Sequence, residues 1–311
     1  MADERAARPA PPLPPDWWPH RERSRFTTVG ALRWHAQHWP GPGGPRAAPL
    51  ALLLHGTGSA THSWRDLAPR LAEHFEVVAP DLPGHAFTLT PASQALSLDA
   101  VAAALTEWLA VQGLRPALVV GHSAGAAIAL RLALAHAVNP ALVVSINGAI
   151  LPLQGPVGRL FLPVARLLSG HSWVAPAFAA WASGAGAARR LLDGTGSRID
   201  AAGERCYAHL VSRREHAAGA LRLMASWDLA PLEAELPALV PPLLLITAQG
   251  DRTLPPSHAH RVRARLPSAR VIEVPELGHL AHEEDAGAIA AMILDAWTEA
   301  ATPRAARAAA G

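Results

Sequence analysis

Ser123 lies in the pentapeptide Gly121-His122-Ser123-Ala124-Gly125, between two apolar segments. Residues 117–120 are typical of a buried strand, and residues 126–130 are typical of the start of a helix. A strand, a tight turn and a helix in this order expose the serine hydroxyl above the end of a sheet, where it can act as a nucleophile. The alternative is a glycine-bounded turn that carries a serine by chance, and the surrounding pattern favours the nucleophile.

A serine needs a general base and a group that orients the base. Asp251 follows the apolar run 242–246, and His279 follows a predicted strand at 271–274. We therefore predict Ser123 as the nucleophile, His279 as the base and Asp251 as the orienting acid. Some hydrolases carry the acid one strand earlier, but residues 147–149 contain no carboxylate here.

Two backbone N–H groups complete the predicted site. The turn His55-Gly56-Thr57-Gly58 follows the buried strand 50–54, which points to the N–H of Thr57 as one donor to an oxyanion. The N–H of Ala124, at the start of the helix after Ser123, is the second donor. Asp81 precedes the serine in the chain, so we interpret it as a structural turn residue.

These motifs identify the chain as similar to α/β-hydrolase-fold proteins from Phe26 to Trp297. More narrowly, it resembles the magnesium chelatase accessory proteins of bacteriochlorophyll biosynthesis. The stretches that carry this narrower resemblance are 55–67, 79–85, 121–127, 195–200, 225–229 and 277–284. The resemblance implies a role near magnesium tetrapyrroles and a transient contact with magnesium chelatase. Ala86 departs from the pattern, because hydrolases with this turn usually have glycine there.

Strand-like and helical segments alternate along most of the chain, which predicts an α/β fold with a mostly parallel, doubly wound sheet. Between residues 149 and 238 the alternation gives way to helical spacing, which predicts a helical cap. The hydrolase core would then consist of residues 26–148 and 239–300. Residues 1–25 are expected to form a Pro-rich flexible tail, and residues 301–311 a second flexible tail.

Aromatic side chains in the cap are candidates to line an apolar substrate pocket above Ser123. We predict this role for Trp173, Trp181 and Trp227, and also for His122 beside the nucleophile. The alternative is that these aromatics pack the cap against the core. A further hypothesis is that His171, His209 or His216 provides an axial ligand to a bound porphyrin, although exposed helix positions are the alternative for each.

Composition narrows the classes of partner. The 27 basic residues are scattered and the formal net charge is +2, so we expect no nucleic-acid partner. No apolar run approaches the ~20 residues of a transmembrane helix, and the first residues lack a signal-peptide core. The chain has a single cysteine, Cys206, so it cannot form an intramolecular disulfide. Together, these features predict a cytoplasmic protein. His279 and His282 have no third ligand nearby, so we predict neither a metal nor a cofactor.

Two functional hypotheses follow from the residues and the resemblance. The first is a serine hydrolase that attacks an ester-like carbonyl of an apolar substrate, such as a tetrapyrrole ester. The second is a non-catalytic accessory protein that holds or delivers a porphyrin for magnesium insertion. A complete set of nucleophile, base, acid and oxyanion donors favours the hydrolase, because a pure binding protein needs none of them.

Overall fold

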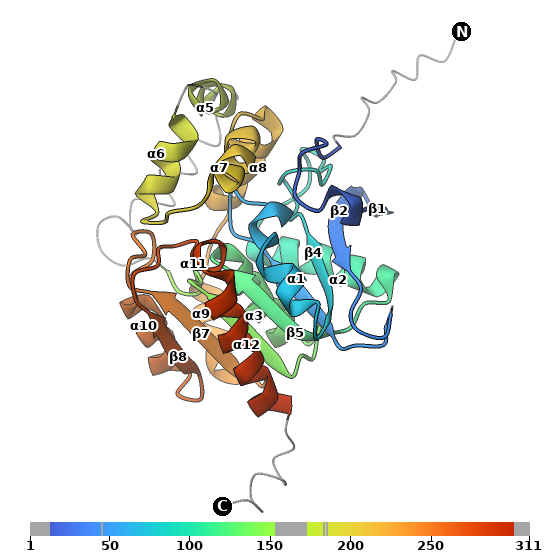
Figure 1. The fold of residues 1–311 in the computed structure, drawn as a ribbon, viewed down its shortest axis with the longest axis vertical. Coiled ribbons are helices and arrows are strands. Elements are labelled where there is room, and N and C mark those ends of the chain that lie inside the picture. Colours follow the sequence, from blue (N-terminus) through green and yellow to red (C-terminus); the bar gives the residue numbers. More distant parts are fainter. Residues whose placement is uncertain (1–12, 45, 153–172, 183, 185, 302–311) are drawn as a thin grey trace, which may run out of the picture.

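The computed structural model describes residues 13–44, 46–152, 173–182, 184 and 186–301. Its described part contains an eight-stranded sheet with the order β1-β2-β4-β3-β5-β6-β7-β8 (Figure 1). The strands are β1 (Ser24–Val29), β2 (Leu32–Trp39), β3 (Leu50–Leu54), β4 (Glu76–Pro80), β5 (Pro116–His122), β6 (Leu142–Ile146), β7 (Leu243–Ala248) and β8 (Arg270–Val274). The pairs β1–β2 and β2–β4 are antiparallel, and all the other pairs are parallel.

Both faces of the central sheet are buried. All residues of β3, β6 and β7 are buried, as expected for parallel strands with helices on both sides. One face packs against α2 (Leu98–Gln112), α3 (Ala124–Leu134) and α10 (Ser257–Arg265), and the other against α1 (Leu67–Leu71) and α12 (Ala286–Ala301). The predicted α/β-hydrolase architecture, with a mostly parallel sheet and a helical insertion, is therefore confirmed.

The helical insertion lies between β6 and β7. Its described helices are α5 (Val174–Ala182), α6 (Ala187–Gly194), α7 (Ala201–Val211) and α8 (Arg214–Ala225), which gather at one end of the molecule (Figure 1). The next elements, α9 (Ala230–Glu235) and η3 (Leu236–Ala238), instead contact α3 of the core. Arg131 on α3 binds both carboxylate oxygens of Glu235, at 2.9 and 2.7 Å. These contacts attach residues 230–238, which the sequence assigned to the cap, to the core helix α3.

The N-terminal segment departs from the sequence-based prediction. Trp18 is only 2% exposed, and its ring meets the Phe87 ring edge-on at 4.9 Å. The short helix η1 (Arg21–Arg23) follows, and β1 already begins at Ser24. The prediction of a flexible tail to residue 25 is wrong from residue 13 onward, because the apolar surface of Trp18 is buried. The expected tails at 1–12 and 302–311 lie outside the described residues.

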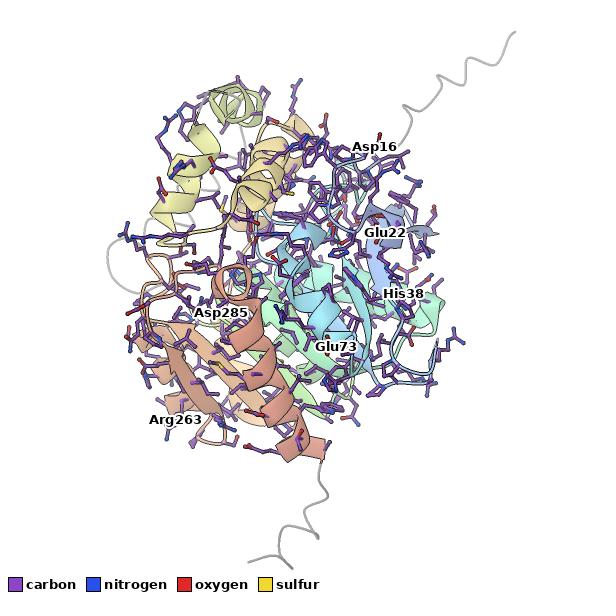
Figure 2. The ribbon with its side chains drawn as sticks, in the orientation of Figure 1. Asp16, Glu22, His38, Glu73, Arg263 and Asp285 are labelled. Atoms are coloured by element: carbon purple, nitrogen blue, oxygen red, sulfur yellow. The ribbon has the colours of Figure 1, made fainter. Side chains whose placement is uncertain are left out.

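Charged side chains are spread over the surface. Asp16, Glu73, Arg263 and Asp285 are all exposed and lie on separate parts of the molecule (Figure 2). None of the helices in the described ranges is long and apolar enough to cross a membrane.

Candidate active site

Ser123 occupies a strained turn between β5 and α3. Its φ of 51° and ψ of −117° lie outside the regions that non-glycine residues ordinarily adopt. The flanking glycines allow this turn to pack tightly, because a Cβ at Gly125 would overlap the carbonyl of Leu54 and one at Gly121 would overlap Ala126. The local sequence thus holds the serine at the carboxyl end of the sheet.

His279 and Asp251 form a directly bonded pair. His279 Nδ1 lies 2.7 Å from Asp251 Oδ2, and both residues are only 6% exposed. The other carboxylate oxygen, Oδ1, accepts the N–H groups of Thr253 and Leu254 at 2.7 and 2.8 Å. Since Asp251 accepts a hydrogen bond from the Nδ1–H of His279, the Nε2 atom of the ring is unprotonated and can accept a proton.

Ser123 and His279 line the same cavity, which brings the predicted nucleophile and base to one site. Within the described residues, no hydrogen bond joins the Ser123 hydroxyl to the imidazole. Such contacts are often long before a substrate is bound.

The two predicted oxyanion donors also face this cavity. Thr57 and Ala124 both line it, and the N–H of neither has a hydrogen-bond acceptor among the described residues. The His55 ring fixes the turn that carries Thr57: its Nδ1 donates to Gly56 O at 2.8 Å, and its Nε2 accepts the Leu82 N–H at 2.9 Å. Two unpaired N–H groups beside a serine can stabilise negative charge on a carbonyl oxygen.

A short distance between the two turns explains the glycine at position 56. A Cβ added to Gly56 would lie 3.0 Å from Ser123 Cβ and 2.9 Å from His122 Nδ1. His122 itself contacts the candidate base, because its Nε2 donates to the carbonyl of His279 at 2.9 Å. Burial, together with the neighbouring His282 and His279, lowers the pKa of His122 well below its usual range. His122 is therefore neutral near pH 7.

Asn147 is a buried contact of the His279 loop that the sequence did not reveal. Its Nδ2 donates to the carbonyls of Gly278 and His279 at 3.1 and 2.9 Å, and its Oδ1 accepts the Ala248 N–H at 2.8 Å. Asn147 thus connects the ends of β6 and β7 to the loop that carries His279. The available signal was an asparagine directly after a buried strand, at the position where some hydrolases carry the acid.

The cap contributes a second support for this loop. The Thr195 carbonyl accepts the N–H groups of Arg252 and His279, at 3.1 and 3.3 Å. Ser197 Oγ accepts the N–H of Leu280 at 2.8 Å. Gly196, between them, adopts a φ of 82° and packs against the carbonyl of Gly250, where a Cβ would not fit. The segment 195–197 therefore locks the cap onto the loops that carry Asp251 and His279.

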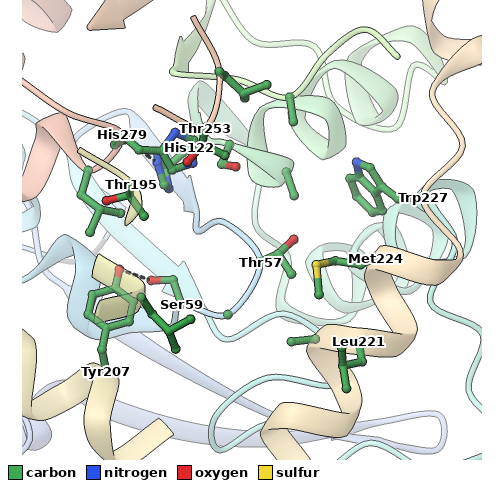
Figure 3. A pocket seen from close by; sticks show the side chains of 18 of the residues that line it. Thr57, Ser59, His122, Thr195, Tyr207, Leu221, Met224, Trp227, Thr253 and His279 are labelled. Atoms are coloured by element: carbon green, nitrogen blue, oxygen red, sulfur yellow. Dashed lines mark hydrogen bonds between the residues drawn. The ribbon is translucent and has the colours of Figure 1, made fainter. Parts of the chain in front are cut away.

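The cavity above Ser123 is mostly apolar and has a volume of about 510 Å³. This size is within the ~300–1,000 Å³ range of small-molecule sites. Figure 3 shows Trp227, Met224 and Leu221 along one side, with Thr57 between them and the polar residues opposite. The apolar part of the lining consists of Ala124, Ala149, Leu151, Pro152, Leu191, Leu192, Val211, Ala217, Ala220, Leu221, Met224, Trp227, Leu229, Leu254 and Leu280.

The predicted pocket residues separate into two groups. His122 and Trp227 line the cavity, and Trp227 is 9% exposed. Trp173 and Trp181 are not part of the described lining, and they are 64% and 48% exposed. The prediction that these two tryptophans line the pocket is wrong, because Trp181 on α5 and Trp173 just before α5 are both largely exposed to solvent.

The structure also tests the three candidate axial ligands. His216 is buried, with Nδ1 accepting the Ala86 N–H at 3.0 Å and Nε2 donating to Gly58 O at 3.2 Å. Because both ring nitrogens are occupied, His216 serves as a bridge from the cap to the core. His209 packs edge-on against Trp17, with ring centroids 5.4 Å apart, and His171 lies outside the described residues.

Two turns that the sequence singled out have structural roles. Ala86 adopts a φ of 44°, which explains why glycine is usual at this place in similar turns. Asp81 accepts the N–H groups of Thr61 and Phe87, and its Oδ2 lies 2.6 Å from His35 Nδ1. Although burial opposes the shift, the neighbouring His35 lowers the pKa of Asp81 to about 2.

Residues 51–292 match the model of the alpha/beta hydrolase family. The chain belongs to this family. It is 40% identical over 91% of its length to the magnesium-chelatase 30 kDa subunit of Rhodobacter capsulatus, and it covers 96% of that protein. No group of His, Cys, Asp and Glu side chains within the described ranges is arranged to hold a metal ion.

Solved structures of other hydrolases share the fold. An alpha/beta hydrolase fold protein from Burkholderia ambifaria superposes with a TM-score of 0.71 at 22% identity, covering 87% of this chain and 97% of that one. The enol-lactonase from Burkholderia xenovorans LB400 gives a TM-score of 0.70 at 19% identity, covering 88% and 100%. At these identities the similarity concerns the fold alone.

We expect the buried histidines to make this hydrolase-family protein less stable in acid. Burial lowers the pKa of seven of them, namely His55, His62, His85, His122, His216, His258 and His282. Above pH 6.5 both the folded and the unfolded chain keep these rings neutral. As the pH falls below 6.5 the unfolded chain binds protons first, so stability is lost until the folded-state pKa values are reached, about 4 for His216 and about 3 for His282.

The expected loss is large. Each such ring contributes up to about 1.4 kcal/mol per pH unit, so the sum at pH 5.5 is on the order of several kcal/mol. Urea denaturation at a series of pH values should show a steep fall in the free energy of unfolding below pH 6.5. His62 has no hydrogen-bond partner for either ring nitrogen among the described residues, so His62→Phe should make the slope shallower. A flat stability profile between pH 7.5 and 5 would contradict this prediction.

Proposed function

We propose that this protein is a serine hydrolase that cleaves an ester-like carbonyl compound with a large apolar group. The observation that carries the proposal is the 2.7 Å bond between His279 and Asp251, next to a strained Ser123 and two N–H groups that lack an acceptor in the described part of the chain. These groups converge on one apolar cavity, which favours an apolar substrate over a charged one.

The proposed reaction follows from the proton positions. His279 Nε2 removes the proton of Ser123 as the hydroxyl attacks the carbonyl carbon, and Asp251 stabilises the imidazolium that forms. The N–H groups of Thr57 and Ala124 hold the oxyanion of the tetrahedral intermediate. His279 then protonates the leaving group, and water attacks the acyl-serine to release the acid.

The similarity to the Rhodobacter capsulatus subunit supports a place for this reaction in bacteriochlorophyll biosynthesis, with a magnesium-tetrapyrrole pathway compound as the apolar substrate and a transient contact with magnesium chelatase. That protein's name describes a chelatase subunit and no hydrolytic reaction. A second candidate function is therefore a non-catalytic protein that binds or delivers porphyrin, and the apolar cavity with Trp227 favours it.

A fluorophosphonate probe tests the hydrolase proposal, because it reacts only with a serine that a base has activated. The wild-type protein should be labelled at Ser123, and Ser123→Ala should not be labelled. Ser145→Ala is a suitable control, since it removes another buried serine at the end of β6 and should leave labelling intact. Failure of the wild-type protein to react would remove the hydrolase proposal and favour the binding protein.

A titration with protoporphyrin tests the tetrapyrrole assignment. Binding in the cavity should quench tryptophan fluorescence and raise the melting temperature, because a flat apolar ring gains most from contact with aromatic and aliphatic walls. Trp227→Ala should weaken binding by about tenfold or more, consistent with the loss of a buried aromatic contact. An unrelated apolar ester of similar size is the control ligand. Equal, weak binding of both ligands, unchanged in Trp227→Ala, would contradict a tetrapyrrole ligand.

A further inference from the structure

A pair of hydroxyl groups interrupts the apolar lining of the cavity. Ser59, from the loop after β3, and Tyr207, from the cap helix α7, both line the cavity with their hydroxyl oxygens 3.2 Å apart. We call these two residues the hydroxyl wall. Figure 3 shows the hydroxyl wall on the side of the cavity opposite Met224 and Trp227. The cavity therefore has a polar side and an apolar side.

A buried carboxylate behind the hydroxyl wall determines the direction of its hydrogen bonds. Tyr207 Oη donates to Glu283 Oε1 at 2.7 Å, and Ser63 Oγ donates to the same oxygen at 2.7 Å. Arg65 donates to the other oxygen, Oε2, at 2.6 Å. Burial raises the pKa of Glu283, while the Arg65 charge and the hydrogen bonds of Tyr207, Ser63 and Arg65 oppose that shift. Three donors thus converge on one carboxylate.

This arrangement leaves Ser59 with acceptor capacity only. Burial raises the pKa of Tyr207 well above its usual range, so its hydroxyl keeps its proton and directs it to Glu283. Ser59 must then donate its own proton to Tyr207 Oη. The lone pairs of Ser59 Oγ have no donor among the described residues, and they remain available to the cavity.

We propose that the hydroxyl wall recognises a hydrogen-bond donor, a hydroxyl or N–H group, on the otherwise apolar substrate. The inference rests on the proposed hydrolase function and adds a specificity determinant to it. A donor at this point would satisfy the free lone pairs of Ser59, whereas an ether or methyl group in the same place would leave them unsatisfied. The apolar body of the substrate would lie toward Met224 and Trp227.

A purely structural role is the alternative, because Tyr207 also joins the cap to the core through Glu283. Matched esters separate the two interpretations. Nitrophenyl esters are made with acyl chains of increasing length that end in a hydroxyl, a methyl ether or a methyl group. For the chain length that reaches the hydroxyl wall, the wild-type protein should prefer the ester that ends in a hydroxyl by up to about tenfold in kcat/KM. A preference of this size corresponds to the contribution of one neutral hydrogen bond.

Three variants identify the wall as the origin of the preference. Ser59→Ala should abolish the preference for the hydroxyl ester. Tyr207→Phe removes the acceptor of the Ser59 proton, so Ser59 becomes a donor to the cavity. The kcat/KM of the ester that ends in a methyl ether should then rise relative to that of the ester that ends in a methyl group. Ser212→Ala, which removes an exposed hydroxyl at the end of α7, should leave the preference unchanged. Equal kcat/KM for the hydroxyl and ether esters at every chain length would overturn the inference.

The two proposals fail in different ways. If the fluorophosphonate probe labels Ser123 but the three ester types react alike, only the hydroxyl wall inference is wrong. If the probe does not label the protein, the same chains are offered as methyl ketones, and binding is measured by thermal shift. A larger shift for the hydroxyl ketone, lost in Ser59→Ala, would support donor recognition without catalysis, and equal shifts would overturn it.

Discussion

Turnover of an activated ester is expected to fall by about 10⁶-fold in His279→Ala and to a similar extent in Ser123→Ala. The two residues act as one unit, since the hydroxyl is a poor nucleophile without a base and the base has no purpose without the hydroxyl. The double variant should therefore be no less active than either single variant, within the error of the assay. Steady-state hydrolysis of a nitrophenyl ester measures all three.

Folding must be preserved for this comparison to be meaningful. Ser123→Ala removes only the hydroxyl group, and the flanking glycines still allow the strained backbone at position 123. The melting temperature of this variant should therefore stay close to that of the wild-type protein. His258→Gln is a suitable control for His279→Ala: His258 is also buried, but its ring accepts the N–H groups of Ile150 and Leu151 away from the base. Turnover within about tenfold of wild type in either Ser123→Ala or His279→Ala would contradict their assignment.

Asp251→Asn should lower turnover by about 10⁴-fold with little loss of stability. The asparagine oxygen can still accept the N–H groups of Thr253 and Leu254, which fixes its amide nitrogen toward His279. His279 Nδ1 must then act as an acceptor, and its proton moves to Nε2, where it faces the serine. The base is consequently blocked by the wrong tautomer rather than by a change in its position.

The pH profile of the Asp251→Asn variant gives a second measurement. Because a tautomer with its proton on Nε2 cannot accept the serine proton, the variant should hydrolyse esters slowly at every pH between 6.5 and 9. Its Ser123 should also resist labelling by the fluorophosphonate probe over this range. Asp228→Asn is the matched control, because Asp228 also lines the cavity but, among the described residues, accepts only the N–H of Ala230, at 3.0 Å. Normal turnover in Asp251→Asn together with a large loss in Asp228→Asn would transfer the acid role to the cap.

The types and order of the candidate catalytic residues could be predicted from the sequence alone. Ser123 and Asp251 follow the buried strands β5 and β7, which are recognisable because a parallel sheet covered on both faces needs continuous apolar runs. His279 follows β8, a partly exposed strand at the edge of the sheet. Parallel strands bring their carboxyl ends to one edge, so residues far apart in the sequence are expected there together. The turn chemistry of glycine identified the elbow for the same local reason.

Positions that depend on packing between distant segments required the tertiary structure. Trp173, Trp181 and Trp227 have the same residue type in the same helical region, and only the packing of each segment decides which ring reaches the cavity. The N-terminal boundary of the fold also depends on packing between distant segments. The Pro-rich composition predicts a flexible tail, but Trp18 in that segment is buried against Phe87.

Supporting polar contacts are the clearest case of tertiary control. Asn147 bonds to the carbonyl of His279 across 132 residues, and Ser59 meets Tyr207 across 148 residues. A buried polar group needs a partner, but the sequence does not say which one, since any nearby carbonyl or hydroxyl satisfies the same requirement. The sequence by itself therefore determined the candidate residues and the sheet that carries them, whereas the folded chain decided which side chains contact His279 and which residues line the cavity.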